Sequence, residues 1–131
     1  MITLRRIRPD QGLQLRELRL RALGDSPMAY GSTFAEERSY SETIWHERAA
    51  NGAAGRNVVT IVAEAKGRLV GMATGLTAGP ENQGKSDPMM VGVFVDSTVR
   101  RQGVGVALID KIVQWVQARV NTPQCLDHVR Q

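Results

Sequence analysis

The sequence predicts an α+β fold in which helices flank a mixed, mostly antiparallel sheet, in the order β-α-α-β-β-β-α with a possible final strand. Three observations lead to this prediction. Two β-branched runs within residues 57–77 are separated by a turn, as in a hairpin. The apolar run 89–96 has the length of a strand buried on both faces. Residues 103–120 repeat apolar side chains at helical spacing.

The length and composition favour one globular domain, residues 1–131. The chain has 131 residues, of which 42% are hydrophobic and 23% charged, as in ordinary globular proteins. No apolar run approaches a membrane span, and the charged N-terminus lacks the apolar region of a signal peptide. We therefore expect a cytoplasmic protein that does not bind membranes.

Charge and residue usage exclude several classes of function. The net charge of +4 favours anionic partners, but the basic residues are scattered and aromatic residues make up only 5%. Nucleic-acid binding would require a clustered basic face, so we expect no nucleic-acid partner and interpret most arginines as solvated. Cys125 is the only cysteine, and His46 and His128 lie far apart, so we expect neither an intramolecular disulfide nor a metal site.

The N-terminal half predicts one strand and two helices. A strand at 2–7 precedes a helix that starts at Pro9-Asp10, with Asp10 as N-cap, and ends at Gly24. The apolar stripe of that helix is Leu13, Leu15, Leu18, Ala22 and Leu23. A polar loop follows, and Ser39 and Glu42 have capping-box spacing before a second helix that ends near Asn51-Gly52.

The C-terminal half predicts the hairpin, a buried strand and a long helix. Strands at 57–65 and 68–77 flank a Lys66-Gly67 turn, and the strand at 89–96 follows a loop. The face of the last helix is expected to consist of Ile109, Ile112, Val113, Val116 and Val120, flanked by Leu108 and Trp115. Residues 125–131 predict at most a short fifth strand.

The stretch GPENQGKS, residues 79–86, matches the P-loop pattern letter for letter. A P-loop joins a strand to a helix whose N-terminus faces the phosphates. Here Lys85-Ser86 is followed by Pro88 and a valine-rich strand, with no room for a crossover helix. We therefore interpret the stretch as an exposed turn. A P-loop function would require ATP or GTP affinity that Lys85→Ala abolishes, and we expect none.

The stretch RRQGVG, residues 100–105, does lie between a strand and a helix. The first turn of a helix has unpaired N–H donors and the positive end of the helix dipole. Gly103 and Gly105 let an anion approach the backbone, and Arg100 and Arg101 add positive charge. These features suit a pyrophosphate, although glycines that pack a helix against a sheet would give the same pattern. The spacing is not the dinucleotide fingerprint.

These residues resemble the GNAT superfamily of N-acetyltransferases. Residues 100–105 match its [QR]-x-x-G-x-[GA] motif, and MMVGVFVDSTV, 89–99, is similar to its fourth strand and the turn after it. The element order agrees over residues 1 to about 120. Residues 27–37 are similar to the loop between the first two helices of many bacterial members.

The resemblance implies that acetyl-CoA is the co-substrate. Its pyrophosphate would lie on the turn, and its pantetheine arm would pair with the fourth strand as an added strand. The residues that bind acetyl-CoA would then be Val93, Phe94, Val95, Arg100, Arg101, Gln102, Gly103, Val104, Gly105 and Val106. A backbone N–H near Val93 or Phe94 would polarise the thioester carbonyl. The acetyl acceptor would be a primary amine of a small molecule or a protein.

The sequence identifies the catalytic residues less clearly than the residues that would bind acetyl-CoA. The strand 89–96 lacks the carboxylate that the family often places there as a base, and the remaining candidates are Glu36, Glu37 and His46. No residue matches the tyrosine that commonly protonates the leaving thiolate. Relatives usually continue through a fifth strand, a helix and two strands, so the chain is predicted to be C-terminally short.

Two explanations for the short C-terminus stay open: a truncation such as a frameshift, or completion of the fold by a second copy. We expect a homodimer, because the edge of the strand 89–96 would otherwise be unpaired. The alternative function is a catalytically impaired acyl-CoA-binding or structural remnant of the same fold.

Overall fold

The computed structural model describes residues 1–25, 33–77 and 88–120 of the chain. In these residues, four antiparallel strands form one sheet in the order β1-β2-β3-β4. The elements are β1 (Ile2–Arg6), α1 (Gly12–Asp25), α2 (Phe34–Arg38), α3 (Glu42–Ala54), β2 (Val58–Ala65), β3 (Arg68–Leu76), β4 (Met89–Val95), a 3-10 helix (Ser97–Val99) and α4 (Val104–Val120). The predicted α+β class and its antiparallel sheet are confirmed. The P-loop-like stretch and the possible fifth strand lie outside the described residues.

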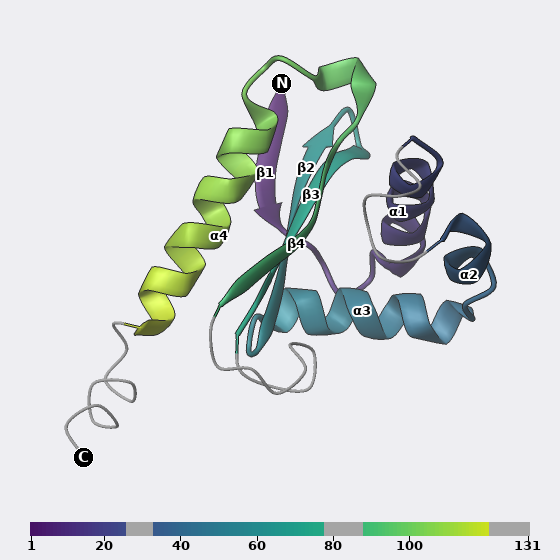
Figure 1. Cartoon of the computed structure of the whole chain (residues 1–131), viewed down its shortest axis with the longest axis horizontal. Coiled ribbons are helices and arrows are strands. Elements are labelled where there is room, and N and C mark those ends of the chain that lie inside the picture. Colours follow the sequence, from purple (N-terminus) through teal and green to yellow (C-terminus); the bar gives the residue numbers. More distant parts are fainter. Residues whose placement is uncertain (26–32, 78–87, 121–131) are drawn as a thin grey trace.

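Helices cover both faces of the sheet (Figure 1). On one face α1 and α3 pack over a core that includes Leu18, Trp45 and Phe94. On the other face α4 packs over a core that includes Val59, Leu108 and Ile112. Adjacent sheet residues alternate between these two cores, as the pleat of a strand requires. No helix in the described ranges is long and apolar enough to cross a membrane.

The β2–β3 hairpin forms as predicted. Its two-residue turn is Lys66-Gly67, with φ angles of 54° and 76°. Two consecutive left-handed residues define a turn whose twist matches that of the flanking strands. At the end of the hairpin away from the turn, Val58 pairs with Leu76. The two strands of the hairpin are the central strands of the sheet.

Several predictions about the first two helices are wrong. Gln11, not Asp10, precedes α1: its carbonyl accepts from the N–H of Leu15 at 2.9 Å. Leu13 is 49% exposed and does not belong to the buried stripe. The region predicted as a loop contains α2, so Ser39 is the C-cap of α2 and Ser41 precedes α3. Helix α3 also runs beyond Asn51-Gly52, to Ala54.

The buried face of α4 is rotated from the predicted one. Leu108, Ile112 and Trp115 are buried, whereas Ile109 and Val113 are 38% and 41% exposed. The reason lies on β3, where a Cβ on Gly75 would stand 2.9 Å from Ile112 and 3.3 Å from Trp115. The bulky side chains of α4 therefore fill the space that the missing side chain of Gly75 leaves.

The prediction that the strand 89–96 is buried on both faces is also wrong. Among the seven residues of β4 only Phe94 is buried, and Met89 and Val91 are 41% and 37% exposed. The strand is the last of the described sheet, paired with β3 on one side. Its apolar composition therefore does not reflect burial on both faces within the described residues.

A polar network ties α1 to the end of β4. The carboxylate of Asp96, only 7% exposed, pairs with Arg21 and accepts from both the backbone N–H and the hydroxyl of Thr98 at 3.0 Å. Arg21 also donates to the carbonyl of Leu69 at 2.7 Å. The pKa of Asp96 lies below its usual value, mainly because the backbone N–H of Thr98 donates to its carboxylate. Burial acts in the opposite direction and raises this pKa. The Thr98 hydroxyl, Arg21 and Arg68 lower it further because they favour the charged form.

Asp96→Asn is expected to lower the free energy of unfolding by about 1–3 kcal/mol at pH 7, because it weakens hydrogen bonds to a charged, buried group. The folded-state pKa of Asp96 is depressed. Its stabilising contribution is therefore complete above the unfolded pKa of about 3.9 and is lost as the pH falls through the folded value. Urea unfolding from pH 3 to 7 measures this, and the difference between the two proteins should shrink toward acid pH. A constant difference would contradict the assignment.

Candidate functional site

A cavity opens where β4 leads into α4. It has a volume of about 470 Å³, and we call it the turn cavity. Its lining consists of Asp25, Val93, Phe94, Val95, Arg100, Arg101, Gly103, Val104, Gly105 and Val106. All the residues predicted from the sequence to bind acetyl-CoA line this cavity, except Gln102. The fold therefore brings the end of β4 and the start of α4 to one concave surface.

The floor of the turn cavity presents backbone donors. The first helical hydrogen bond of α4 runs from the N–H of Ala107 to the carbonyl of Gly103 at 3.0 Å. The N–H groups of Val104, Gly105 and Val106 find no acceptor among the described residues. Arg101 and Gly103 have φ angles of 67° and 77°, which curl the backbone into the concave form that binds anions. These donors suit a diphosphate.

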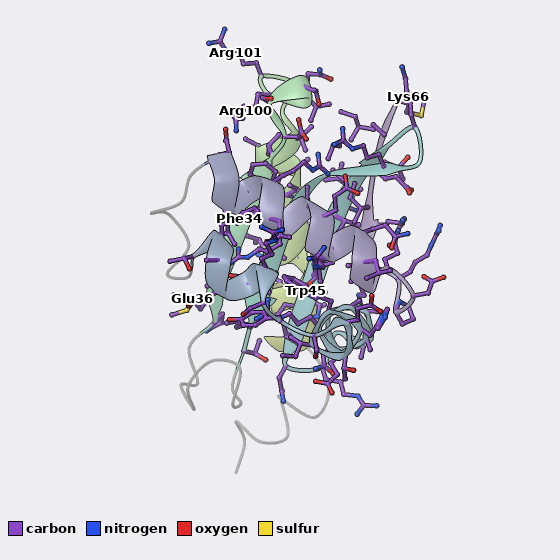
Figure 2. The ribbon with its side chains drawn as sticks, turned by 90° about the vertical axis from the view of Figure 1, so that its right-hand side faces the viewer. Phe34, Glu36, Trp45, Lys66, Arg100 and Arg101 are labelled. Carbon is purple, nitrogen blue, oxygen red and sulfur yellow. The ribbon has the colours of Figure 1, made fainter. Side chains whose placement is uncertain are left out.

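The two arginines of the turn differ in their surroundings. Arg100 donates from Nε to the carbonyl of Val95 at 3.0 Å and pairs with the carboxylate of Asp25 at the end of α1. Figure 2 shows Arg101 projecting outward from the same end of the molecule. Arg100 therefore connects the end of β4 to the end of α1 beside the turn cavity. Sequence reasoning missed Asp25, since no pattern relates it to an arginine 75 residues away.

A bulge in β4 lies next to the turn cavity. Met72 pairs with Phe94 and Thr74 with Val91, so Gly92 and Val93 together face the single residue Ala73. Gly92 has a φ of 63°, the left-handed conformation that a bulge of this type requires. The extra residue turns β4 and interrupts its ladder with β3. Val93 lines the turn cavity, whereas Gly92 lines a second cavity.

Gly92→Ala is expected to lower the free energy of unfolding by about 1–2 kcal/mol, the cost of a left-handed non-glycine residue. The new Cβ would also stand 3.3 Å from Nη1 of Arg19, which must shift. Gly24→Ala is the matched control: it is helical and has open space around it, so we expect a gain of about 0.5–1 kcal/mol. Thermal unfolding measures both, and equal effects would contradict the role of the bulge.

The second cavity has a volume of about 420 Å³ and lies between α1, α3 and the sheet. We call it the arginine cavity. Its lining consists of Leu15, Arg19, Trp45, Arg48, Asn51, Val58, Thr60, Met72, Thr74, Leu76, Val91 and Gly92. Two arginines thus face a mostly apolar chamber that reaches the bulge of β4.

A buried carboxylate holds these two arginines. Glu37, 2% exposed, accepts from Nε and Nη2 of Arg19 at 3.0 and 3.1 Å and from Nη1 of Arg48 at 3.4 Å. A bidentate pair of this kind fixes the guanidinium plane. Arg19, paired with Glu37, and Arg21, paired with Asp96, are half-buried exceptions to the interpretation of most arginines as solvated.

The three candidates for the catalytic base lie in different surroundings. Glu36 is exposed at the rim of the molecule (Figure 2). Glu37 lies beside the arginine cavity but accepts hydrogen bonds from two arginines. His46 is exposed where α1 and α3 approach closely: a Cβ on Gly12 would stand 2.5 Å from its Nδ1. His46 lines neither cavity. The structure therefore does not bring the three together.

The fold and the turn together define a class of protein: an α+β protein in which a glycine turn opens a helix beside a bulged strand. The family comparison agrees. The chain matches the model of the Acetyltransferase (GNAT) family over residues 16–128 and belongs to that family. The resemblance found in the sequence is thereby confirmed, and acyl transfer is the chemistry of the family.

Solved acetyltransferases share the fold. The PaiA N-acetyltransferase from Thermoplasma acidophilum, crystallised with coenzyme A, aligns with a TM-score of 0.71 at 10% identity over 91% of this chain and 74% of its own. A predicted acetyltransferase with acetyl-CoA from Clostridium acetobutylicum gives 0.65 at 16% identity, over 91% and 75%. The ribosomal-protein-alanine N-acetyltransferase from Brucella melitensis biovar Abortus 2308 gives 0.67 at 15%, over 91% and 74%. None of the curated proteins matches this chain.

Proposed function

We propose that this protein is an acetyl-CoA-dependent N-acetyltransferase that acetylates a primary amine of a small molecule or a protein. One observation carries the proposal: the bulge of β4 separates a cavity with unpaired helix N–H donors from a cavity able to hold an acceptor. A donor and an acceptor bound on either side would meet at Gly92 and Val93. Two similar folds crystallised with coenzyme A or acetyl-CoA support the choice of donor.

The donor would occupy the turn cavity. The N–H groups of Val104, Gly105 and Val106 would bind the pyrophosphate, aided by the positive end of the α4 dipole. The pantetheine arm would lie along β4, from Val93 to Val95. Arg100 already donates to the carbonyl of Val95. Pairing of the arm with β4 would therefore not use that carbonyl.

The reaction would form a bond between the amine nitrogen and the acetyl carbon and break the bond between that carbon and sulfur. The amine loses a proton, and the coenzyme A thiolate leaves and takes one up. Backbone N–H groups at the bulge would stabilise the oxyanion that develops between these steps. Glu37 is ion-paired with Arg19 and Arg48, which suits a structural role better than that of a base. The amine proton would then pass to solvent water.

Calorimetric titration of acetyl-CoA, followed by an assay of coenzyme A release with a panel of amines, tests the proposal. We expect binding and amine-dependent release. Binding without release for any amine would instead support an acyl-CoA-binding remnant. The chain spans about three quarters of the length of each of the three solved structures above. No binding would refute both.

We also propose that residues 1–131 act as one acetyltransferase domain, in the cytoplasm and as a homodimer. The exposed Met89 and Val91 of β4 support the dimer, since strand edges with apolar side chains tend to pair. Light scattering at micromolar concentration measures the mass directly. A clean monomer would contradict the dimer and leave the acetyltransferase proposal untouched.

A further inference from the structure

We propose that the acceptor amine carries an anionic group, a carboxylate or a phosphate, which Arg48 binds in the arginine cavity. This inference rests on the proposed acetyltransferase function and adds the substrate class. The acceptor would place its amine at the bulge of β4 and its anion at α3. A polycationic amine would then be a poor acceptor.

The surroundings of Arg48 are those of a preorganised anion site. Its guanidinium carbon lies 5.0 Å from the ring centre of Tyr40 and 4.9 Å from that of Trp45. Stacking on aromatic rings holds the guanidinium plane while leaving its N–H edge available. Among the described residues only Glu37 accepts from Arg48, through Nη1 at 3.4 Å. The other N–H groups remain to bind a ligand.

The charge balance of the cavity favours an anion. Arg19 and Arg48 line it, and its lining within residues 1–25, 33–77 and 88–120 includes no aspartate or glutamate. Glu37, buried beside them, is an ion-pair partner of both arginines, so these three described side chains together carry one positive charge in excess. The side chain of Arg48 is 43% exposed, compared with 16% for Arg19. Arg48 is therefore the cation that an incoming ligand can reach.

The remaining lining determines the size of the acceptor and its orientation. A volume of about 420 Å³ admits a small molecule. Trp45, Arg48 and Asn51 come from α3, whereas Val91 and Gly92 come from β4 at the bulge. An acceptor with an anion at one end and an amine at the other spans from α3 to the bulge. The apolar residues Leu15, Met72 and Leu76 suit the carbon chain between the two groups.

Matched acceptor pairs test the inference. The assay of coenzyme A release compares β-alanine with β-alaninamide, phosphoethanolamine with ethanolamine, and all of these with the diamine putrescine. We expect kcat/KM for the anionic member to exceed that of its neutral partner by about 10- to 100-fold, as for a hydrogen-bonded charge. Which anion gives the larger ratio distinguishes carboxylate from phosphate. Equal values, or faster acetylation of putrescine, would overturn the inference.

Variants of Arg48 connect the preference to the residue. In Arg48→Gln the ratio between anionic and neutral acceptors should fall to about one, with the KM for acetyl-CoA unchanged. Arg48→Lys keeps the charge without the planar fork and should retain part of the ratio. Arg38→Gln removes an exposed charge outside the cavity and should leave the ratio intact. Persistence of the full ratio in Arg48→Gln would refute the role of Arg48.

A binding measurement separates this inference from the proposed function. The probe is the monophosphate of ethylene glycol, which keeps the anion of phosphoethanolamine but has a hydroxyl in place of the amine. It is titrated into the protein with coenzyme A present. Binding that Arg48→Gln weakens by about 10-fold or more supports the anion site even if no amine is acetylated. Acetylation of neutral amines without any such binding would support the function and overturn the anion site.

Discussion

Gly105→Asp is expected to abolish acetyl-CoA binding while leaving the fold intact. Gly105 lies in the first turn of α4, where an added carboxylate would face the predicted pyrophosphate. At about 4 Å, two like charges near a protein surface repel by about 4 kcal/mol. We therefore expect the Kd for acetyl-CoA to rise at least about 100-fold. Isothermal calorimetry measures the change.

The same substitution should not harm the free protein. A Cβ on Gly105 would lie 3.6 Å from Cγ2 of Val95, an ordinary contact. An aspartate in the first helical turn interacts favourably with the helix dipole and stabilises the helix by about 0.3–1 kcal/mol. Gly105→Asn has nearly the same shape without the charge and should bind acetyl-CoA far better than Gly105→Asp. Equal affinities in the two variants would show that charge at this turn does not matter, against a pyrophosphate site there.

The glycine turn was predictable because its evidence is local. A strand, a turn and an amphipathic helix follow one another within residues 89–120, and each leaves its own pattern in the sequence. The P-loop pattern at 79–86 was rejected on the same local grounds, and that stretch lies outside the described residues. The position of a turn depends mainly on the elements on either side of it, so the order of elements predicts it better than any single side chain.

The arginine cavity was not predictable, because its evidence is distant in sequence. Glu37 looks like a surface residue within the polar stretch 33–38, yet its partners are Arg19 on α1 and Arg48 on α3. The rotation of α4 has a similar origin, since Gly75 on β3 decides which residues pack. Both features depend on contacts between elements, and the sequence of one element does not contain them.

Glu37→Gln is expected to lower the free energy of unfolding by about 3–5 kcal/mol, the cost of breaking a buried ion pair by removing one partner. The variant would leave the half-buried guanidinium of Arg19 without its carboxylate and would release one anchor of Arg48. Urea unfolding measures the loss. Glu36→Gln, an exposed carboxylate on the same helix, is the control and should change stability by less than about 0.5 kcal/mol.

The same variant separates a structural role of Glu37 from a catalytic one. Replacing the pair together, as Arg19→Met with Glu37→Leu, should recover much of the stability lost in Glu37→Gln, because no unpaired charge stays buried. If Glu37 were also the base, Glu37→Gln would in addition lower kcat by about 100-fold or more in the folded protein and remove the acidic limb of its pH profile. Because the carboxylate is already held by Arg19 and Arg48, we expect the loss to appear in stability.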